Sequence, residues 1–265
     1  MVLERVDDAE PRGTAGPSDG PAEPRGTAGR SDGTGDPRGT TGSSDGTGDP
    51  HALTRDEYLR RGRTHLTVDP VLAPLVGRIE PPEPRRDGDL YIDLIDGIVS
   101  QQLSVKAAAA IMGRFLALFP DGRPEPGAVR SRDEETLRGV GLSRPKIRYL
   151  YGITEAIETG EINLPEIARL GDEEFIREIT RLKGVGRWTA EMLLIFSLGR
   201  RDVFSLGDLG LRTAVSRLYE VDREDYDAIA KIASTWKPYR SLACHYLWKS
   251  LNNEPGVGAR PARES

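Results

Sequence analysis

A short glycine-containing segment, LKGVGRWTAEM at residues 182–192, has the residue types of an anion-binding turn. Gly184 and Gly186 allow a tight turn with positive φ and let another backbone approach closely. Lys183 and Val185 complete the turn, and the backbone N–H groups at the start of the next helix would point outward toward an anion such as a phosphate. From these residues alone, a plain turn between two helices with a glycine C-cap stays open as the alternative.

The elements that would position this turn are predicted to be helices, because apolar residues recur every three or four positions from Thr54 onward. Asp69 and Pro70 are typical of a helix start, and Ser104 is expected to cap another helix. No alternating strand pattern with hairpin turns is found. We therefore expect an all-α domain of about ten helices over residues 52–253, with helices over these ranges: 69–80, 89–100, 105–119, 133–140, 143–160, 172–182, 187–199, 208–219, 226–236 and 238–251.

Composition excludes several classes of site. The single cysteine, Cys244, rules out an internal disulfide and a four-thiolate zinc or iron–sulfur site, and three scattered histidines make no metal-binding spacing. No apolar run is long enough to span a membrane and no signal segment is found, so a cytoplasmic location is expected. No cofactor is predicted.

The first fifty residues differ from the rest. Residues 10–50 repeat with a period of 13, as in EPRGTAGRSDGTG, and contain almost nothing apolar. Such units cannot bury enough surface to offset chain entropy, so residues 1–50 and the C-terminal 254–265 are expected to be disordered. The first fifty residues carry ten acids and five bases, which leaves the body neutral and neither demands nor excludes nucleic acid.

The motifs that follow the glycine turn occur in an ordered set. WTA follows the turn, then DVF at 202–204, then an aspartate, Asp208, that opens the next helix. Further matches are IVSQQLSVKAA, LRGVGLSRPKIRYL and WKPYRSLACHYLW, and together they cover most of residues 65–250. This set resembles the HhH-GPD superfamily of base-excision glycosylases, and within it the AlkA-like DNA-3-methyladenine glycosylase II group.

The resemblance implies a two-lobed helical fold and a catalytic carboxylate at Asp208. That carboxylate would stabilise the positive charge that develops on the sugar as the base leaves, and would position the attacking water. An N-cap is the ordinary role of such an aspartate, and the two roles are compatible. Asp202 is the competing acid, and its family position is structural. The sequence departs from some relatives at Gly207, where they carry a second acid.

Trp188 stands where bifunctional members carry a lysine nucleophile, so the resemblance implies a monofunctional enzyme that uses water. Its ring, with Tyr239 and Met192 at other pocket positions of the family, would receive an electron-poor alkylated purine such as 3-methyladenine or 7-methylguanine. Core packing is the alternative role for the two aromatic residues.

The enzyme would have to flip the damaged base out of the duplex. The turn SQQLS at 100–104 resembles the family's intercalating loop, with Gln102 and Leu103 as the wedge; an N-terminal capping turn with Leu103 in the core is the alternative. Lys146 is a candidate phosphate contact or a solvated lysine. The hairpin carbonyls are also candidate ligands for a monovalent cation, as in some relatives.

The sequence thus predicts a monomeric, monofunctional alkylpurine-DNA glycosylase that acts on double-stranded DNA with damaged bases. With only about forty ordered-looking residues before LYIDLIDGIVSQQ, it resembles the compact, all-helical branch. A non-catalytic helix–hairpin–helix DNA-binding module is the alternative from another class. Asp208, Trp188 and Tyr239 together favour the enzyme, because a binder needs only the hairpin.

Overall fold

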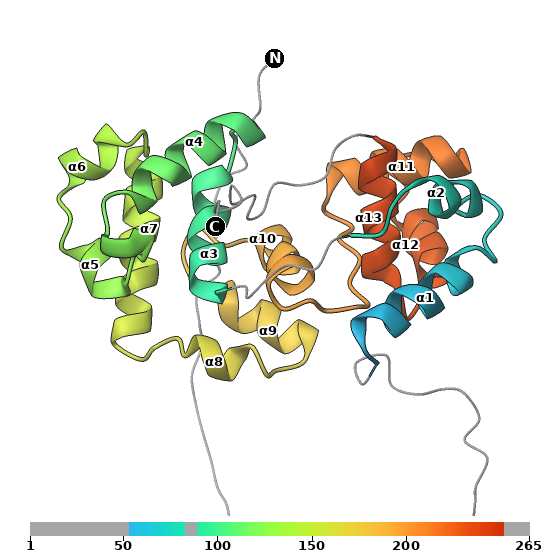
Figure 1. Cartoon of the computed structure of the whole chain (residues 1–265), viewed down its shortest axis with the longest axis horizontal. Coiled ribbons are helices and arrows are strands. Elements are labelled where there is room, and N and C mark those ends of the chain that lie inside the picture. Colours follow the sequence, from blue (N-terminus) through green and yellow to red (C-terminus); the bar gives the residue numbers. More distant parts are fainter. Residues whose placement is uncertain (1–52, 83–88, 252–265) are drawn as a thin grey trace, which may run out of the picture. The chain divides into compact units, whose positions relative to one another are not determined.

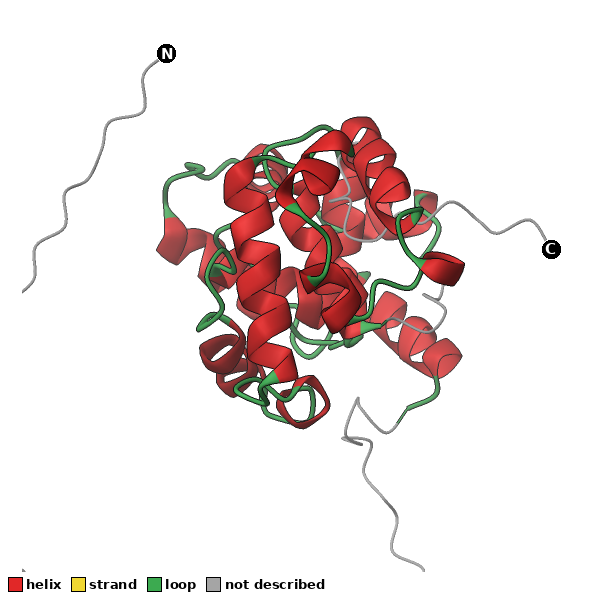
Figure 2. Cartoon of the chain, turned by 90° about the vertical axis from the view of Figure 1, so that its left-hand side faces the viewer, coloured by secondary structure: helices red, strands yellow, loops and turns green. Residues whose placement is uncertain are grey.

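The computed structural model describes residues 53–82 and 89–251, and its elements there are helices (Figure 1). Figure 2 shows helices and loops and no strand among these described residues. The predicted tails, 1–50 and 254–265, lie outside the described residues. The helices are α1 (Arg55–Leu66), α2 (Ala73–Arg78), α3 (Leu90–Ser100), α4 (Val105–Leu116), α5 (Pro126–Arg130), α6 (Glu134–Gly139), α7 (Arg144–Glu158), α8 (Leu164–Ile167), α9 (Asp172–Ile179), α10 (Arg187–Met192), α11 (Leu209–Tyr219), α12 (Tyr226–Ser234) and α13 (Arg240–Ser250).

Side-chain caps explain where many of these helices begin. The Ser104 hydroxyl accepts from Ala107 N–H at the start of α4, as predicted, and Asp89 does the same for α3. Such caps satisfy backbone donors that have no partner inside the helix. Two short turns complete the helical chain, a 3₁₀ turn at Pro120–Gly122 and a π-helical turn at Leu193–Ser197 that continues α10.

One predicted helix starts later than its sequence suggested. Residues 69–72 form turns, and α2 begins only at Ala73. Pro74, in the first turn of α2, has no N–H to donate to an earlier carbonyl, so it suits a helix start better than a helix interior. Asp69 still caps locally, because its Oδ1 accepts from the N–H groups of Val71 and Leu72.

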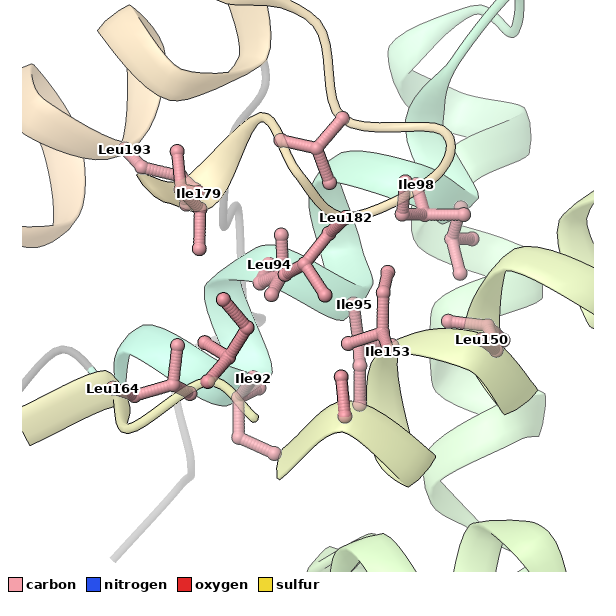
Figure 3. Close-up of a cluster of buried hydrophobic side chains, with 14 of the residues drawn as sticks. Ile92, Leu94, Ile95, Ile98, Leu150, Ile153, Leu164, Ile179, Leu182 and Leu193 are labelled. Atoms are coloured by element: carbon pink, nitrogen blue, oxygen red, sulfur yellow. The ribbon is translucent and has the colours of Figure 1, made fainter. Parts of the chain in front are cut away.

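The apolar residues gather in two clusters. The first runs from α3 to α10 and is built mainly of Ile and Leu side chains (Figure 3). The second joins α1 and α2 to α11, α12 and α13 and is richer in Trp and Tyr. Ile195, in the π-helical turn, packs against both clusters. The predicted all-helical fold with two lobes is confirmed, each lobe enclosing one cluster. No helix in the described residues is long and apolar enough to cross a membrane.

Candidate active site

The glycine turn joins α9 to α10 as a helix–hairpin–helix, and the two helices are in contact (Figure 1). Val185 N–H donates to the Leu182 carbonyl at 3.0 Å, which closes the turn around Gly184 at φ +94°. A Cβ at Gly184 would lie 2.6 Å from the ring of Tyr149 on α7. Glycine is thus required both for its backbone angle and for its lack of a side chain.

The second glycine serves the start of α10. Gly186 is the N-cap, its φ is −93°, and it has no side chain to occupy the first N–H groups of the helix. Gly186 and the neighbouring Lys183 are exposed, while Val185 is buried in the first cluster and holds the turn in place. The arrangement leaves backbone donors beside a cation at the surface, as an anion-binding turn requires.

Asp208 is a buried carboxylate that three donors hold in place. It is 6% exposed, and as the N-cap of α11 its Oδ1 accepts from Leu211 N–H at 2.7 Å. Trp248 Nε1 donates to the same oxygen at 2.9 Å, and Trp188 Nε1 donates to Oδ2 at 2.8 Å. Since each carboxylate oxygen can accept about two hydrogen bonds, the donors among residues 53–82 and 89–251 fill Oδ1 and leave one acceptor position open on Oδ2.

Trp188, which lies just after the hairpin, connects it to the Asp208 carboxylate through a hydrogen bond. It lies in the first turn of α10, and its indole N–H is committed to Asp208 while the side chain stays 38% exposed. An exposed tryptophan is unusual because so large an apolar ring is ordinarily buried. The structure therefore joins an accessible aromatic surface to a buried, oriented carboxylate.

A second layer of contacts positions the loop before Asp208. The Glu191 carboxylate accepts from the Ser205 hydroxyl and, at 2.9 Å, from Arg187 Nε on the same helix. The Ser205 carbonyl in turn accepts from the Asp208 N–H at 3.1 Å. Hydrogen bonding of this kind holds a carboxylate on a short loop in one orientation.

Cys244 and Asp202 are two further residues whose surroundings are structural. Cys244 lies beside Asp208 with no exposed surface, and burial raises the pKa of the thiol well above its usual value, with the negative charge of Asp208 adding to the effect. Asp202, the competing acid, is bound to Arg240, whose Nε lies 2.7 Å from Asp202 Oδ1. That ion pair gives Asp202 the structural role expected of it.

The predicted wedge forms a tight turn between α3 and α4. Leu103 N–H donates to the Ser100 carbonyl at 3.1 Å, Gln101 has φ −52° and ψ 129°, and Gln102 has φ +59°. These values describe a type II turn, in which the third position ordinarily belongs to glycine. Gln102 and Leu103 are exposed, so the alternative of Leu103 in the core does not hold.

Three predicted residues, Met192, Tyr239 and Lys146, are engaged within the protein. Met192 has no exposed surface and Tyr239 is 8% exposed, both in the second cluster, with Tyr239 packed on Tyr58 and His65. Such burial is usual for large apolar groups, and the place of both residues in a base pocket stays a prediction. The ammonium of Lys146 donates to the carbonyls of Val99 and Gln101, both at 2.7 Å, so it closes the end of α3. Its phosphate contact stays a prediction.

Sequence reasoning missed three functional candidates. Trp248, Glu191 and Gln101 each contact a predicted motif, yet Trp248 lies 40 residues from Asp208 and Gln101 lies 83 residues from its partner, Gly184. For Glu191 the available signal was an acid about one turn after Trp188, directly before the apolar residues 192–196.

Comparisons with known proteins show the family of this chain. The family model of the HhH-GPD superfamily base excision DNA repair protein matches residues 95–238, more than half of the chain. The chain belongs to the HhH-GPD superfamily. Within that superfamily, DNA-3-methyladenine glycosylase 1 of Schizosaccharomyces pombe is 41% identical over 184 residues, which cover 68% of this chain and 80% of the relative.

Solved HhH-GPD structures are similar as well. The S. pombe 3-methyladenine DNA glycosylase in complex with abasic DNA has a TM-score of 0.66 and 36% identity, covering 76% of this chain and all of that one. The DNA-3-methyladenine glycosidase of Bacillus halodurans has a TM-score of 0.62 and 34% identity, covering 71% of this chain and 87% of the other. The HhH-GPD chain described here thus shares its fold with a protein whose structure contains DNA.

Proposed function

We propose that this protein is a monofunctional DNA glycosylase, which removes alkylated purines such as 3-methyladenine and 7-methylguanine from duplex DNA and leaves an abasic site. The observation that carries the proposal is the Asp208 carboxylate, with one acceptor position open on the oxygen that Trp188 contacts. The names of the relatives support the substrate class, since they are 3-methyladenine glycosylases.

The chemistry follows from charge. As the N-glycosidic bond breaks, positive charge grows on the sugar, and a fixed carboxylate stabilises that charge without reorganising. The open position on Oδ2 would accept a hydrogen from the attacking water and draw off its proton. The exposed ring of Trp188 offers a π face to a cationic or electron-poor base.

Hydrolysis without strand cleavage is part of the proposal. An amine nucleophile would form a Schiff base with the sugar, and the family position for that amine holds Trp188. Lys183, the nearest lysine in the sequence, precedes the hairpin glycines and is exposed at the surface. The protein is further proposed to act as a monomer, which sedimentation at the concentration of the assay would check.

The test uses purified protein and methylated duplex DNA. Release of free 3-methyladenine, with strands cut only after hot alkali and no complex trapped by borohydride, would support the monofunctional enzyme. A strand cut without alkali, or a borohydride-trapped complex, would contradict hydrolysis by water. Duplex binding without release of any methylated base would favour a binding module in place of an enzyme.

A further inference from the structure

The turn at 100–104 and the hairpin at 182–186 are joined by one side chain. Gln101 Nε2 donates to the Gly184 carbonyl at 2.9 Å, across 83 residues of sequence. Gln101 is half-buried and lies at the second position of the type II turn, directly before the exposed Gln102 and Leu103. The bond therefore links the base of one surface turn to the backbone of another.

Helix α7 supports both ends of this link. Lys146 and Tyr149 are three residues apart, so they lie on one face of the helix. Lys146 holds the Gln101 carbonyl at 2.7 Å, while the ring of Tyr149 packs against Gly184. The side chain and the carbonyl of Gln101 are thus both engaged, and the glycine that accepts its amide is fixed from the other side.

The turn has a reason to need such a link. Gln102 has φ +59°, a region that residues with a side chain seldom occupy and that persists only when neighbouring contacts enforce it. Without the Gln101 bond, the turn could relax to another conformation. The population of the conformation in which Gln102 and Leu103 both project from the surface would then be lower.

We propose that Gln101 is a positioning residue that couples the turn carrying Gln102 and Leu103 to the hairpin, so that both engage duplex DNA in one fixed relation. This inference rests on the proposed function, because it takes the turn as the wedge and the hairpin as the phosphate contact. Gln101 acts through these two loops, and its own amide is occupied by Gly184.

The test compares Gln101→Met with Arg132→Met. Methionine keeps the length of glutamine without its donor, and Arg132 donates to the Leu118 carbonyl at 2.7 Å, a bond of the same kind within the same lobe. The probe is a duplex with 2-aminopurine beside a tetrahydrofuran abasic analogue, whose fluorescence rises when a wedge unstacks the bases. Affinity for that duplex, thermal unfolding and single-turnover release of 3-methyladenine are measured alongside.

Gln101→Met is expected to lower the population of the unstacked state and the single-turnover rate by roughly 3- to 10-fold, the effect of one lost hydrogen bond. Affinity for the duplex should fall less, because the hairpin itself is intact. Lys146→Met, which removes the bonds to the Val99 and Gln101 carbonyls, should also lower the population of the unstacked state, and it should weaken duplex binding more than Gln101→Met because Lys146 is itself a predicted phosphate contact. Arg132→Met should change thermal unfolding only.

Equal unstacking by wild type and Gln101→Met would overturn the inference, as would equal losses in Gln101→Met and Arg132→Met. The unstacking signal does not require excision, so it tests the coupling even if the wild type releases no methylated base. In that case the proposed function fails, and the fluorescence difference between wild type and Gln101→Met alone decides whether Gln101 couples the two loops.

Discussion

Replacing Asp208 by asparagine separates its structural role from its chemical one. Asparagine keeps a side-chain oxygen, which can still accept from Leu211 N–H and from Trp248 Nε1. Its amide nitrogen would then stand where Oδ2 was and face the Trp188 indole, donor against donor. Because Trp188 is 38% exposed, water can take up the indole hydrogen, which limits the cost.

We therefore expect a destabilisation of about 1 to 2 kcal/mol from the one lost bond. For a helical domain of this size, that lowers Tm by roughly 2 to 8 °C. Since domains are ordinarily stable by about 5 to 15 kcal/mol, the variant stays folded at 25 °C. The chemical effect is much larger, because loss of a preorganised charge opposite the transition state costs about 100- to 1000-fold in rate.

The assay is single-turnover release of 3-methyladenine from methylated duplex DNA at 25 °C, with duplex affinity measured separately. Asp202→Asn is the matched control, because it removes the same charge from an ion pair with Arg240. It should lower Tm and leave the rate at the wild-type value. Excision by Asp208→Asn at the wild-type rate, or an equal loss in both variants, would refute the role assigned to Asp208.

Three further predictions concern the hairpin, Asp69 and the N-terminal repeats. Gly184→Ala should lower Tm and weaken binding to damaged and undamaged duplex alike, because a Cβ at this position would lie 2.6 Å from Tyr149 and the backbone φ is +94°. If fluorescence anisotropy shows unchanged affinity for the duplex, the hairpin is not a phosphate contact. Burial favours a higher pKa for Asp69, but its bonds from Tyr219, Trp236 and the backbone outweigh burial and lower that pKa. The stabilisation by the ionised Asp69 should therefore be present above its unfolded pKa of about 3.9 and be lost as the pH falls through its lower pKa in the folded protein. The Tm difference between wild type and Asp69→Asn should consequently shrink in acid. A constant Tm difference from pH 7 to pH 2 would exclude this stabilising role of the Asp69 carboxylate. Deletion of residues 1–50 should leave the single-turnover excision rate unchanged, and a large loss would give the repeats a part in catalysis.

Local signals in the sequence predicted the hairpin and ten of the thirteen helices in the described residues, whereas α1, α5 and α8 lie outside the predicted ranges. A capping residue such as Ser104, or a glycine at a turn such as Gly184, acts through neighbours within a few residues, so the sequence displays both partners. The start of α2 at Ala73 was missed because two prolines compete there, and only packing decides which one begins the helix.

The contacts that assemble the site were beyond such signals. Trp188, Trp236 and Trp248 are all the tryptophans of the chain, and each donates its indole hydrogen to an aspartate at least 20 residues away. Sequence spacing predicts that a tryptophan will be buried, but the acceptor for its N–H depends on tertiary packing. Tyr239 and Met192 show the same limit, since family position predicts them at the pocket, whereas their burial depends on packing.

The two aspartates that accept these indole hydrogens, Asp69 and Asp208, differ in the number of acceptor positions that are filled. Asp69 accepts from two backbone N–H groups at Oδ1, and from Tyr219 at 2.6 Å and Trp236 at 3.0 Å at Oδ2. All four of its acceptor positions are thus filled, and it has no capacity left for a substrate or a water. Asp208 receives three such bonds from the described residues, and its open position is on the oxygen that the exposed Trp188 contacts. A tryptophan partner is common to both aspartates, so that feature does not identify the site. The unfilled acceptor position beside an accessible aromatic ring is the feature that supports the proposed role of Asp208, because hydrolysis requires a carboxylate that can still accept a proton from water.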